Sequence, residues 1–340
     1  MEVIDKKTFE SRVLRDIHSS VIVLDNKGMI RYINKPAARK FEIDENVEPG
    51  KVHFEANVEN SYNDDFNQYI FDSIYQKKSI HSGTVKYMSK SGIQFVFRIS
   101  ASYFEEEDFV IITLEDITIE NALEERVHDS SLVFTAFLFM LSIWIIICEF
   151  VDYIGNTIPH HIMTIGVEIM GILLFIFILK FTSLTFKDIG LFTSNTKKVV
   201  RDGILISISC IIILVLIKFI TRQFNPNAFK PNMPFFNLDT VKRIGITYFF
   251  TAGVQEFLAR GVVQSNLERM IVGEHKKGIA IVLSGLLFAT LHVYYGFFFM
   301  MGAAVLAMIE GVLYSKQKSL ISIWIVHYVF GLVGMTLSLV

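Results

Sequence analysis

The sequence predicts an α+β domain at residues 1–118, followed by an all-α membrane domain of about seven helices at residues 132–340. Of the 340 residues 52% are hydrophobic, and the mean hydropathy is +0.45, which is more apolar than an ordinary soluble protein. Residues 1–130 carry 16 Lys/Arg against 24 Asp/Glu, whereas residues 131–340 carry 16 against 10. An acidic part and a basic, apolar part are therefore joined near residue 130.

Cysteine usage and the first residues limit the class of protein further. Cys148 and Cys210 both lie in apolar runs, which excludes a disulfide framework and a CxxC metal site. The opening MEVIDKKTFESRVLRDIHSS lacks the apolar core of a signal peptide, so we expect the first domain to be cytoplasmic, on an inner or cytoplasmic membrane. The sequence contains neither a phosphate-binding glycine loop nor a basic stripe, so we expect no nucleic acid as partner.

The first domain begins with a hairpin signal. Residues 21–33, VIVLDNKGMIRYI, alternate on either side of a turn in which Asn26 and Gly28 accept the positive φ of a tight connection. Ser89, Lys90, Ser91 and Gly92 form a second turn between strands. Helices are expected at residues 35–41 and 62–77, and three further strands at residues 82–88, 93–102 and 108–115.

This order of elements resembles a PAS domain over residues 10–118, with VIVLDNKGMIRYINKPAARKFEI at the front and VIITLEDITIENALEER at the end. The resemblance implies a sensory and dimerisation module, so a homodimer through this domain is one expected partnership. Some PAS domains hold haem, flavin or a small ligand. The domain has no cysteine, which excludes a flavin–cysteine photoadduct, and its histidines, His18, His53 and His81, are expected at the surface or in loops rather than on a haem.

Residues 119–131 form a charged helical linker. Apolar Ile119, Leu123 and Val127 recur at a spacing of four and form a rough stripe. The linker is either a solvated spacer or a short dimeric coil that carries a signal to the membrane, and the sequence leaves both open.

The second part contains seven apolar stretches, each close to the ~20 residues that span a hydrocarbon core. Lys and Arg gather in the loops 183–202 and 265–278, which agrees with a cytoplasmic N-terminus by the positive-inside rule. The lipid bilayer is thus an expected partner. The stretches lie at residues 132–151, 162–182, 203–220, 244–264, 279–297, 298–314 and 319–339.

Ionisable residues inside these stretches are candidate site residues, because a charge at the bilayer centre costs roughly 2.5–3.5 kcal/mol even on insertion scales. Glu256 and Arg260 stand at i and i+4, where they can pair. Such a pair alone could be structural. The full set is Glu168, Glu256, Arg260, His292, Glu310 and His327.

Two histidines add chemistry to the pair. Counting ~1.5 Å per helical residue from the nearest basic flank puts Glu256, His292 and His327 at similar depths in three different stretches. A carboxylate and two imidazoles in a lipid-shielded cavity could activate a water, or could ligate a divalent metal with that water in an open position. Hydrolysis within the membrane follows from either arrangement.

The motifs QEFLARGVVQ, LSGLLFATLHV and SLISIWIVHYVFG resemble those of the CAAX prenyl-protease and bacteriocin-processing (abortive-infection) family of intramembrane proteases. The family patterns are Glu-Glu-x-x-x-Arg, Phe-x-x-x-His and His-x-x-x-Asn, and the match extends over about residues 180–339. In the family the first glutamate activates water, together with the two histidines, and the asparagine steadies the oxyanion. The resemblance assigns the motif positions Glu256, Arg260, Phe288, His292 and His327.

Two positions depart from the family pattern. Gln255 stands in place of the first glutamate and has no proton-accepting carboxylate, whereas Gly331 stands in place of the asparagine and has no side-chain amide. Glu256 is rotated by about 100° from Gln255 on a helix, and would face the water only if the helix were rotated or distorted. His292 or Glu310 could serve as the base instead.

Two functions are therefore expected from the sequence. The first is a PAS-regulated intramembrane endopeptidase that hydrolyses membrane-associated peptides or proteins, with Glu256, His292, His327 and Arg260 in its site. The second is a catalytically dead pseudoprotease that acts as a membrane sensor or peptide-binding regulator.

Overall fold

The computed structural model describes residues 17–58, 60–156, 158–193, 195–226 and 234–339. The expected start of the PAS-like domain, at residue 10, lies outside the described residues. The chain divides into two compact units, Met1–Glu124 and Glu125–Val340, and each is described by itself.

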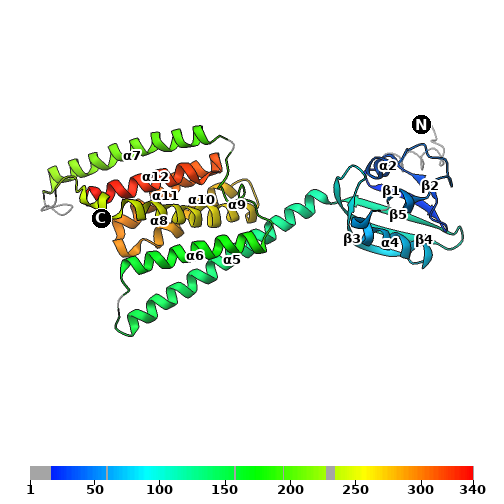
Figure 1. The fold of residues 1–340 in the computed structure, drawn as a ribbon, viewed down its shortest axis with the longest axis horizontal. Coiled ribbons are helices and arrows are strands. Elements are labelled where there is room, and N and C mark those ends of the chain that lie inside the picture. The colour runs from blue at the N-terminus through cyan, green and yellow to red at the C-terminus, as the bar shows by residue number, and fades with distance from the viewer. Residues whose placement is uncertain (1–16, 59, 157, 194, 227–233, 340) are drawn as a thin grey trace, which may run out of the picture. The chain divides into compact units, whose positions relative to one another are not determined.

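The N-terminal unit is built on a five-stranded antiparallel sheet in the order β2-β1-β5-β4-β3 (Figure 1). The predicted hairpin is present: β1 and β2 pair across a turn in which Gly28 has a φ of 75°. The first and the last strand of the unit are neighbours in the sheet: β1 pairs with β5 from Ser20↔Leu114 to Asp25↔Phe109. The strands are β1 (Ser20–Asp25), β2 (Ile30–Ile33), β3 (Ile80–Met88), β4 (Gln94–Phe104) and β5 (Phe109–Asp116).

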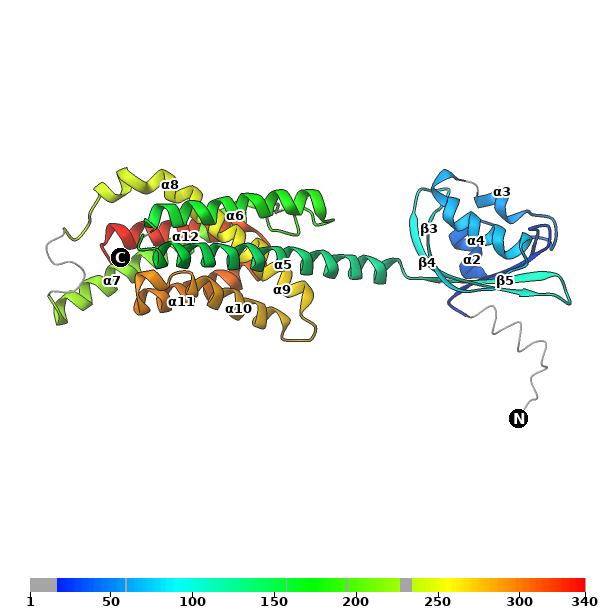
Figure 2. The same cartoon turned by 90° about the horizontal axis from the view of Figure 1, so that it is seen from below.

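Short helices between β2 and β3 cover one face of the sheet (Figure 2). Asn34 caps the first of them, since its side chain accepts hydrogen bonds from the backbone N–H of Ala37 at 3.1 Å and of Val21 at 3.0 Å. The helices are α2 (Lys35–Phe41), α3 (Phe54–Val58), the 3₁₀ turn η1 (Ser61–Asn63) and α4 (Asp64–Tyr75).

Aromatic rings fill the space between these helices and the sheet. Phe41 lies at the centre, with its ring centroid 5.2 Å from that of Phe54, 5.7 Å from Phe66 and 4.9 Å from Tyr87. All four side chains are at most 2% exposed. A haem or flavin between sheet and helices would therefore have to displace this cluster. His18 and His81 are exposed, as the sequence predicts.

The second unit is helical (Figure 1). Helix α5 begins at Thr118, with one residue between it and the end of β5, and it continues to Tyr153, so the predicted linker and the predicted first span form one continuous helix. The elements are α5 (Thr118–Tyr153), α6 (His160–Phe181), α7 (Thr196–Phe224), α8 (Asp239–Glu256), the π-helix η2 (Phe257–Gln264), α9 (Ser265–Met270), α10 (Lys276–Thr290), the 3₁₀ turn η3 (Val293–Tyr295), α11 (Phe297–Gln317) and α12 (Leu320–Thr336).

Four helices within the described residues are long and apolar enough to cross a membrane: Thr118–Tyr153, Ile162–Phe181, Thr196–Phe224 and Phe297–Gln317. Helix α12 is apolar but shorter. The predicted count of seven spans is therefore not confirmed. The stretch 279–297 is divided, because α10 ends at Thr290 and a 3₁₀ turn follows.

The core of this unit lies around η2. Val133, Phe137 and Leu141 of α5 pack in one cluster with α6 residues such as Leu174 and with Phe257 of η2. On the other side, Trp324 of α12 donates from its indole N–H to the Phe249 carbonyl at 2.7 Å, which holds α12 against α8. The segment with the predicted site motif is thus enclosed by helices.

Candidate functional site

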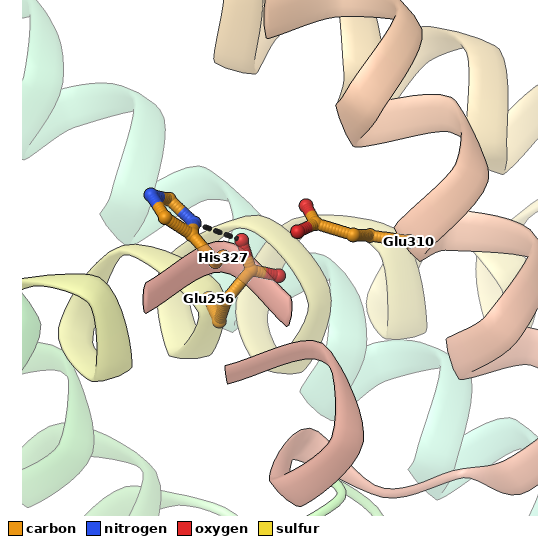
Figure 3. A group of neighbouring side chains, drawn as sticks. All are labelled: Glu256, Glu310 and His327. Carbon is orange, nitrogen blue, oxygen red and sulfur yellow. Dashed lines mark hydrogen bonds and ion pairs between the residues drawn. The ribbon is translucent and has the colours of Figure 1, made fainter. Parts of the chain in front are cut away.

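A carboxylate and an imidazole from two helices form the centre of the site (Figure 3). Glu256 is the last residue of α8, and His327 lies in the middle of α12. The His327 Nδ1 atom is 2.6 Å from Glu256 Oε1, and the two side chains are 5% and 0% exposed. A carboxylate can only accept, so Nδ1 carries the proton, and Nε2 is the ring nitrogen that points away from Glu256 (Figure 3).

Arg260 supplies the positive charge beside this pair. Its Nε donates to Glu256 Oε2 at 3.3 Å, as the i, i+4 spacing predicts, and its Nη2 lies 3.5 Å from Glu310 Oε2. The same guanidinium donates to Ser284 Oγ at 3.2 Å and to the Ala307 carbonyl at 2.7 Å. Arg260 therefore joins η2 to α10 and α11 and compensates two fully buried carboxylates.

A π-helix directly follows Glu256, the residue that contacts His327. The distortion that the sequence requires begins directly after Glu256, where η2 replaces α-helical hydrogen bonds by wider i→i−5 bonds, such as that from the Ser265 N–H to the Arg260 carbonyl. Side chains from the following helix satisfy carbonyls of η2: Asn266 Nδ2 donates to Val262 O at 2.6 Å, and Ser265 Oγ donates to Gly261 O. The wide turns thereby keep hydrogen-bond partners in the apolar interior.

His292 reaches the site from the end of α10. Its Nδ1 lies 2.8 Å from the Phe288 carbonyl, which can only accept, so Nδ1 carries the proton and Nε2 is the basic nitrogen. The Phe288 ring lies beside both imidazoles, with centroids 4.6 Å from His292 and 5.5 Å from His327. The family position Phe288 therefore spaces the two histidines.

Two cavities meet these histidines. The larger, of about 520 Å³, is lined by both histidines and by Tyr248 and Gly331, with an otherwise mostly apolar wall from α7, α11 and α12. The smaller, of about 110 Å³, is lined by His292, Gln255 and Ser284 and by apolar residues that include Phe137 of α5. Gln255 thus lines the smaller cavity, whereas Glu256 contacts His327. His292 lines both cavities.

The contact between Glu256 and His327 is that of a hydrogen-bonded pair rather than of two ligands on one metal ion. Among the described residues, ligand atoms of Glu256, Glu310 and His327 lie within 4.8 Å of one another, and His292, which the sequence groups with Glu256 and His327, is not in this set. Two ligands of one zinc ion at ~2.0–2.2 Å stand roughly 3.3 Å apart in tetrahedral geometry. The Nδ1–Oε1 separation of 2.6 Å is a hydrogen bond instead. Arg260 already provides the cation.

Sequence reasoning missed Tyr248 and underestimated Glu310. Glu310, which the sequence offers as an alternative base, lies against Arg260 and is fully buried. Tyr248 is one of several aromatic residues in its apolar stretch, and it carries no charge that would single it out. The signal that could have found it is Gly331, which has no side chain and against which Tyr248 packs. Glu168, the remaining predicted carboxylate, lies on α6. It accepts a hydrogen bond at 2.6 Å from Thr251 of α8.

Comparisons with known proteins give results for both units. Several PAS and LOV domains are structural neighbours of the N-terminal unit. A PAS domain from a two-component sensor histidine kinase is 18% identical, with a TM-score of 0.24, covering 33% of this chain and 96% of that chain. The PAS domain of an HTR-like protein from Haloarcula marismortui is 18% identical, with a TM-score of 0.26, over 33% and 99%. The LOV protein of Rhodobacter sphaeroides is 13% identical, with a TM-score of 0.29, over 38% and 80%.

No curated protein matches the chain. A family model does match part of it, and the matching part contains Glu256, Arg260, His292, Glu310 and His327. The four long apolar helices and this match together indicate a membrane protein. Residues 237–333 match the family described as type II CAAX prenyl endopeptidase Rce1-like.

Proposed function

We propose that the protein is an intramembrane endopeptidase that hydrolyses membrane-associated peptides or proteins. The observation that carries the proposal is the buried contact of 2.6 Å between Glu256 and His327, with His292 on the wall of the same cavity. A carboxylate that holds an imidazole by Nδ1 is an arrangement that supports general acid–base catalysis. The match to an endopeptidase family over residues 237–333 supports the same reaction class.

In this proposal His292 is the general base and His327 is a hydrogen-bond donor to the developing oxyanion. His292 Nε2 accepts a proton from a water molecule, and the resulting hydroxide attacks the carbonyl carbon of the peptide bond. In this step His327 is an imidazolium with a proton on each ring nitrogen; Glu256 stabilises its positive charge, and its Nε2–H donates a hydrogen bond to the carbonyl oxygen as negative charge develops there. His292 returns its proton to the nitrogen of the leaving amine, so the peptide bond breaks and a carboxyl and an amine are released. Among the described residues, the larger cavity is lined by no Asp, Glu, Lys or Arg, so it suits an apolar segment of substrate.

The test is peptide cleavage by the full chain reconstituted in lipid vesicles, with a fluorogenic peptide anchored in the same membrane. We expect cleavage by the natural sequence and a loss of about a hundredfold or more in His292→Ala, because the variant lacks the base. Thr290→Ala, a change at the exposed last residue of α10, two positions before His292, is the matched control. Equal rates in the natural sequence and His292→Ala would contradict the proposal.

A pseudoprotease is the alternative, and the observation that favours it is Gln255. This residue lines the smaller cavity beside His292, where the family has a proton-accepting carboxylate. Cleavage that appears only in Gln255→Glu, and is lost again in Gln255→Glu/His292→Ala, would support a binding or sensing role for the natural sequence.

We further propose that the N-terminal unit lies in the cytoplasm and regulates cleavage through α5. This helix is continuous from Thr118, next to the central strand β5, to Tyr153, and it places Phe137 in the wall of the smaller cavity with His292. A rotation of α5 would move Phe137 relative to His292. The acidic N-terminal part and the basic loops 183–202 and 265–278 support the cytoplasmic placement.

Insertions of alanine after Val127 test this coupling. Each inserted helical residue turns the following part of α5 by ~100°, so two residues reverse its face and four nearly restore it. We expect the cleavage rate to change strongly with two inserted residues and to return with four. Equal rates for the two insertions would contradict transmission by the helix face.

A further inference from the structure

Tyr248 occupies the space that a side chain at position 331 would take. Gly331 stands four residues after His327 on α12, on the wall of the larger cavity. A Cβ at Gly331 would lie 1.9 Å from Tyr248 Oη and 2.5 Å from Cζ, distances at which no two such atoms coexist. The phenol of α8 therefore reaches the backbone of α12 only because residue 331 is glycine.

This placement brings a hydroxyl donor to the reacting side of the site. The Tyr248 ring centroid is 6.1 Å from that of His327, and both side chains line the larger cavity with His292. Within the described part of the chain, no hydrogen bond engages the phenol hydroxyl with another residue. The hydroxyl is thus available to a group that enters the cavity.

A second donor is chemically useful at this point. A tetrahedral intermediate of peptide hydrolysis carries its negative charge on one oxygen, and preorganised donors aimed at that oxygen lower the barrier. His327 Nε2–H supplies one donor in the proposed mechanism, whereas Gly331 supplies none. A phenol is among the side chains that serve as such donors, because its O–H is more acidic than an aliphatic hydroxyl.

We propose that Tyr248 is a catalytic residue whose phenol O–H donates to the oxyanion of the scissile peptide, from the place left open by Gly331. The proposal rests on the proposed endopeptidase function. The hydroxyl keeps its proton throughout and forms no covalent bond, so the balance of the reaction is unchanged. The two residues depend on each other, because Tyr248 can take this place only if residue 331 has no side chain.

The test measures kcat and KM of the full chain in vesicles with the same anchored peptide. Tyr248→Phe removes the hydroxyl and keeps the ring, and we expect kcat to fall by about 10²–10³ with KM nearly unchanged. Tyr328→Phe is the matched control: Tyr328 packs with its ring centroid 6.1 Å from that of Tyr248 but does not line the larger cavity, so kcat should stay within about twofold.

An exchange of donors separates catalysis from packing. Tyr248→Ala opens the space beside position 331, and Gly331→Asn in that background places an amide donor there. We expect the double variant to recover at least tenfold of the kcat that Tyr248→Ala loses. Natural kcat in Tyr248→Phe overturns the role of Tyr248 while leaving the endopeptidase function intact. Absence of cleavage by the natural sequence overturns both proposals.

Discussion

Glu256→Gln is expected to lower kcat for peptide cleavage by about 10⁴-fold. Glutamine keeps the shape of the side chain but removes the negative charge that stabilises His327 when Nε2 is protonated, and its amide can present N–H to His327 Nδ1–H, 2.6 Å away. Replacing the carboxylate that orients a catalytic histidine by its amide has an effect of this order in serine proteases. The measurement is kcat in vesicles with the anchored peptide.

Glu168→Gln is the control for Glu256→Gln. Glu168 is also a carboxylate of the helical unit, and it accepts one hydrogen bond from Thr251 at 2.6 Å, but it lines neither cavity at the histidines. We expect its kcat within about threefold of the natural value. If both glutamine variants lost activity alike, the loss would reflect damage to the helical unit and the role of Glu256 would be wrong.

Arg260→Met is expected to destabilise the helical unit by about 3–5 kcal/mol, because it leaves Glu256 and Glu310 buried without a cation. The measurement is equilibrium unfolding in mixed micelles, followed by tryptophan fluorescence. Both tryptophans of the chain, Trp144 and Trp324, lie in the helical unit, so the signal reports that unit alone.

Two further variants define the cause. Arg243→Met changes an exposed arginine of the neighbouring helix α8 and should shift the free energy of unfolding by less than about 0.5 kcal/mol. Arg260→Met/Glu310→Leu removes one of the unpaired carboxylates and should recover part of the loss. A double variant no more stable than Arg260→Met would show that the Glu310 charge is not the source of the instability.

The N-terminal unit was largely predictable because its signals are local. Alternation of apolar residues and the turn at Gly28 predicted the hairpin, and the strands expected at 93–102 and 108–115 correspond to β4 and β5. The helix expected at 35–41 has those bounds in the structure. Local patterns did not predict the filled interior, which depends on how Phe41 packs against rings from three other elements.

The site was predictable in part, from helical spacing and from the depth of Glu256 and His327 in their apolar stretches. The pair of Glu256 and Arg260 came from the i, i+4 rule, and the structure places its atoms 3.3 Å apart. The depth estimate assumed unbroken helices, whereas α8 passes into a π-helix and α10 ends before His292. Contacts of Tyr248 and Glu310 with the site depend on packing between helices distant in sequence, which no spacing rule contains.

The π-helix η2 also constrains how this gene segment can vary in length. A π-helix differs from an α-helix by about one extra residue within a turn, so loss of a single residue between Phe257 and Gln264 would let the segment become α-helical. Glu256 would then turn by ~100° relative to the helix that follows, away from the partners that Arg260 holds in place. In this region the number of residues is therefore as much a part of the site as their identity: loss of Leu258 or Ala259 alone would displace Glu256 while both Glu256 and Arg260 remain in the chain.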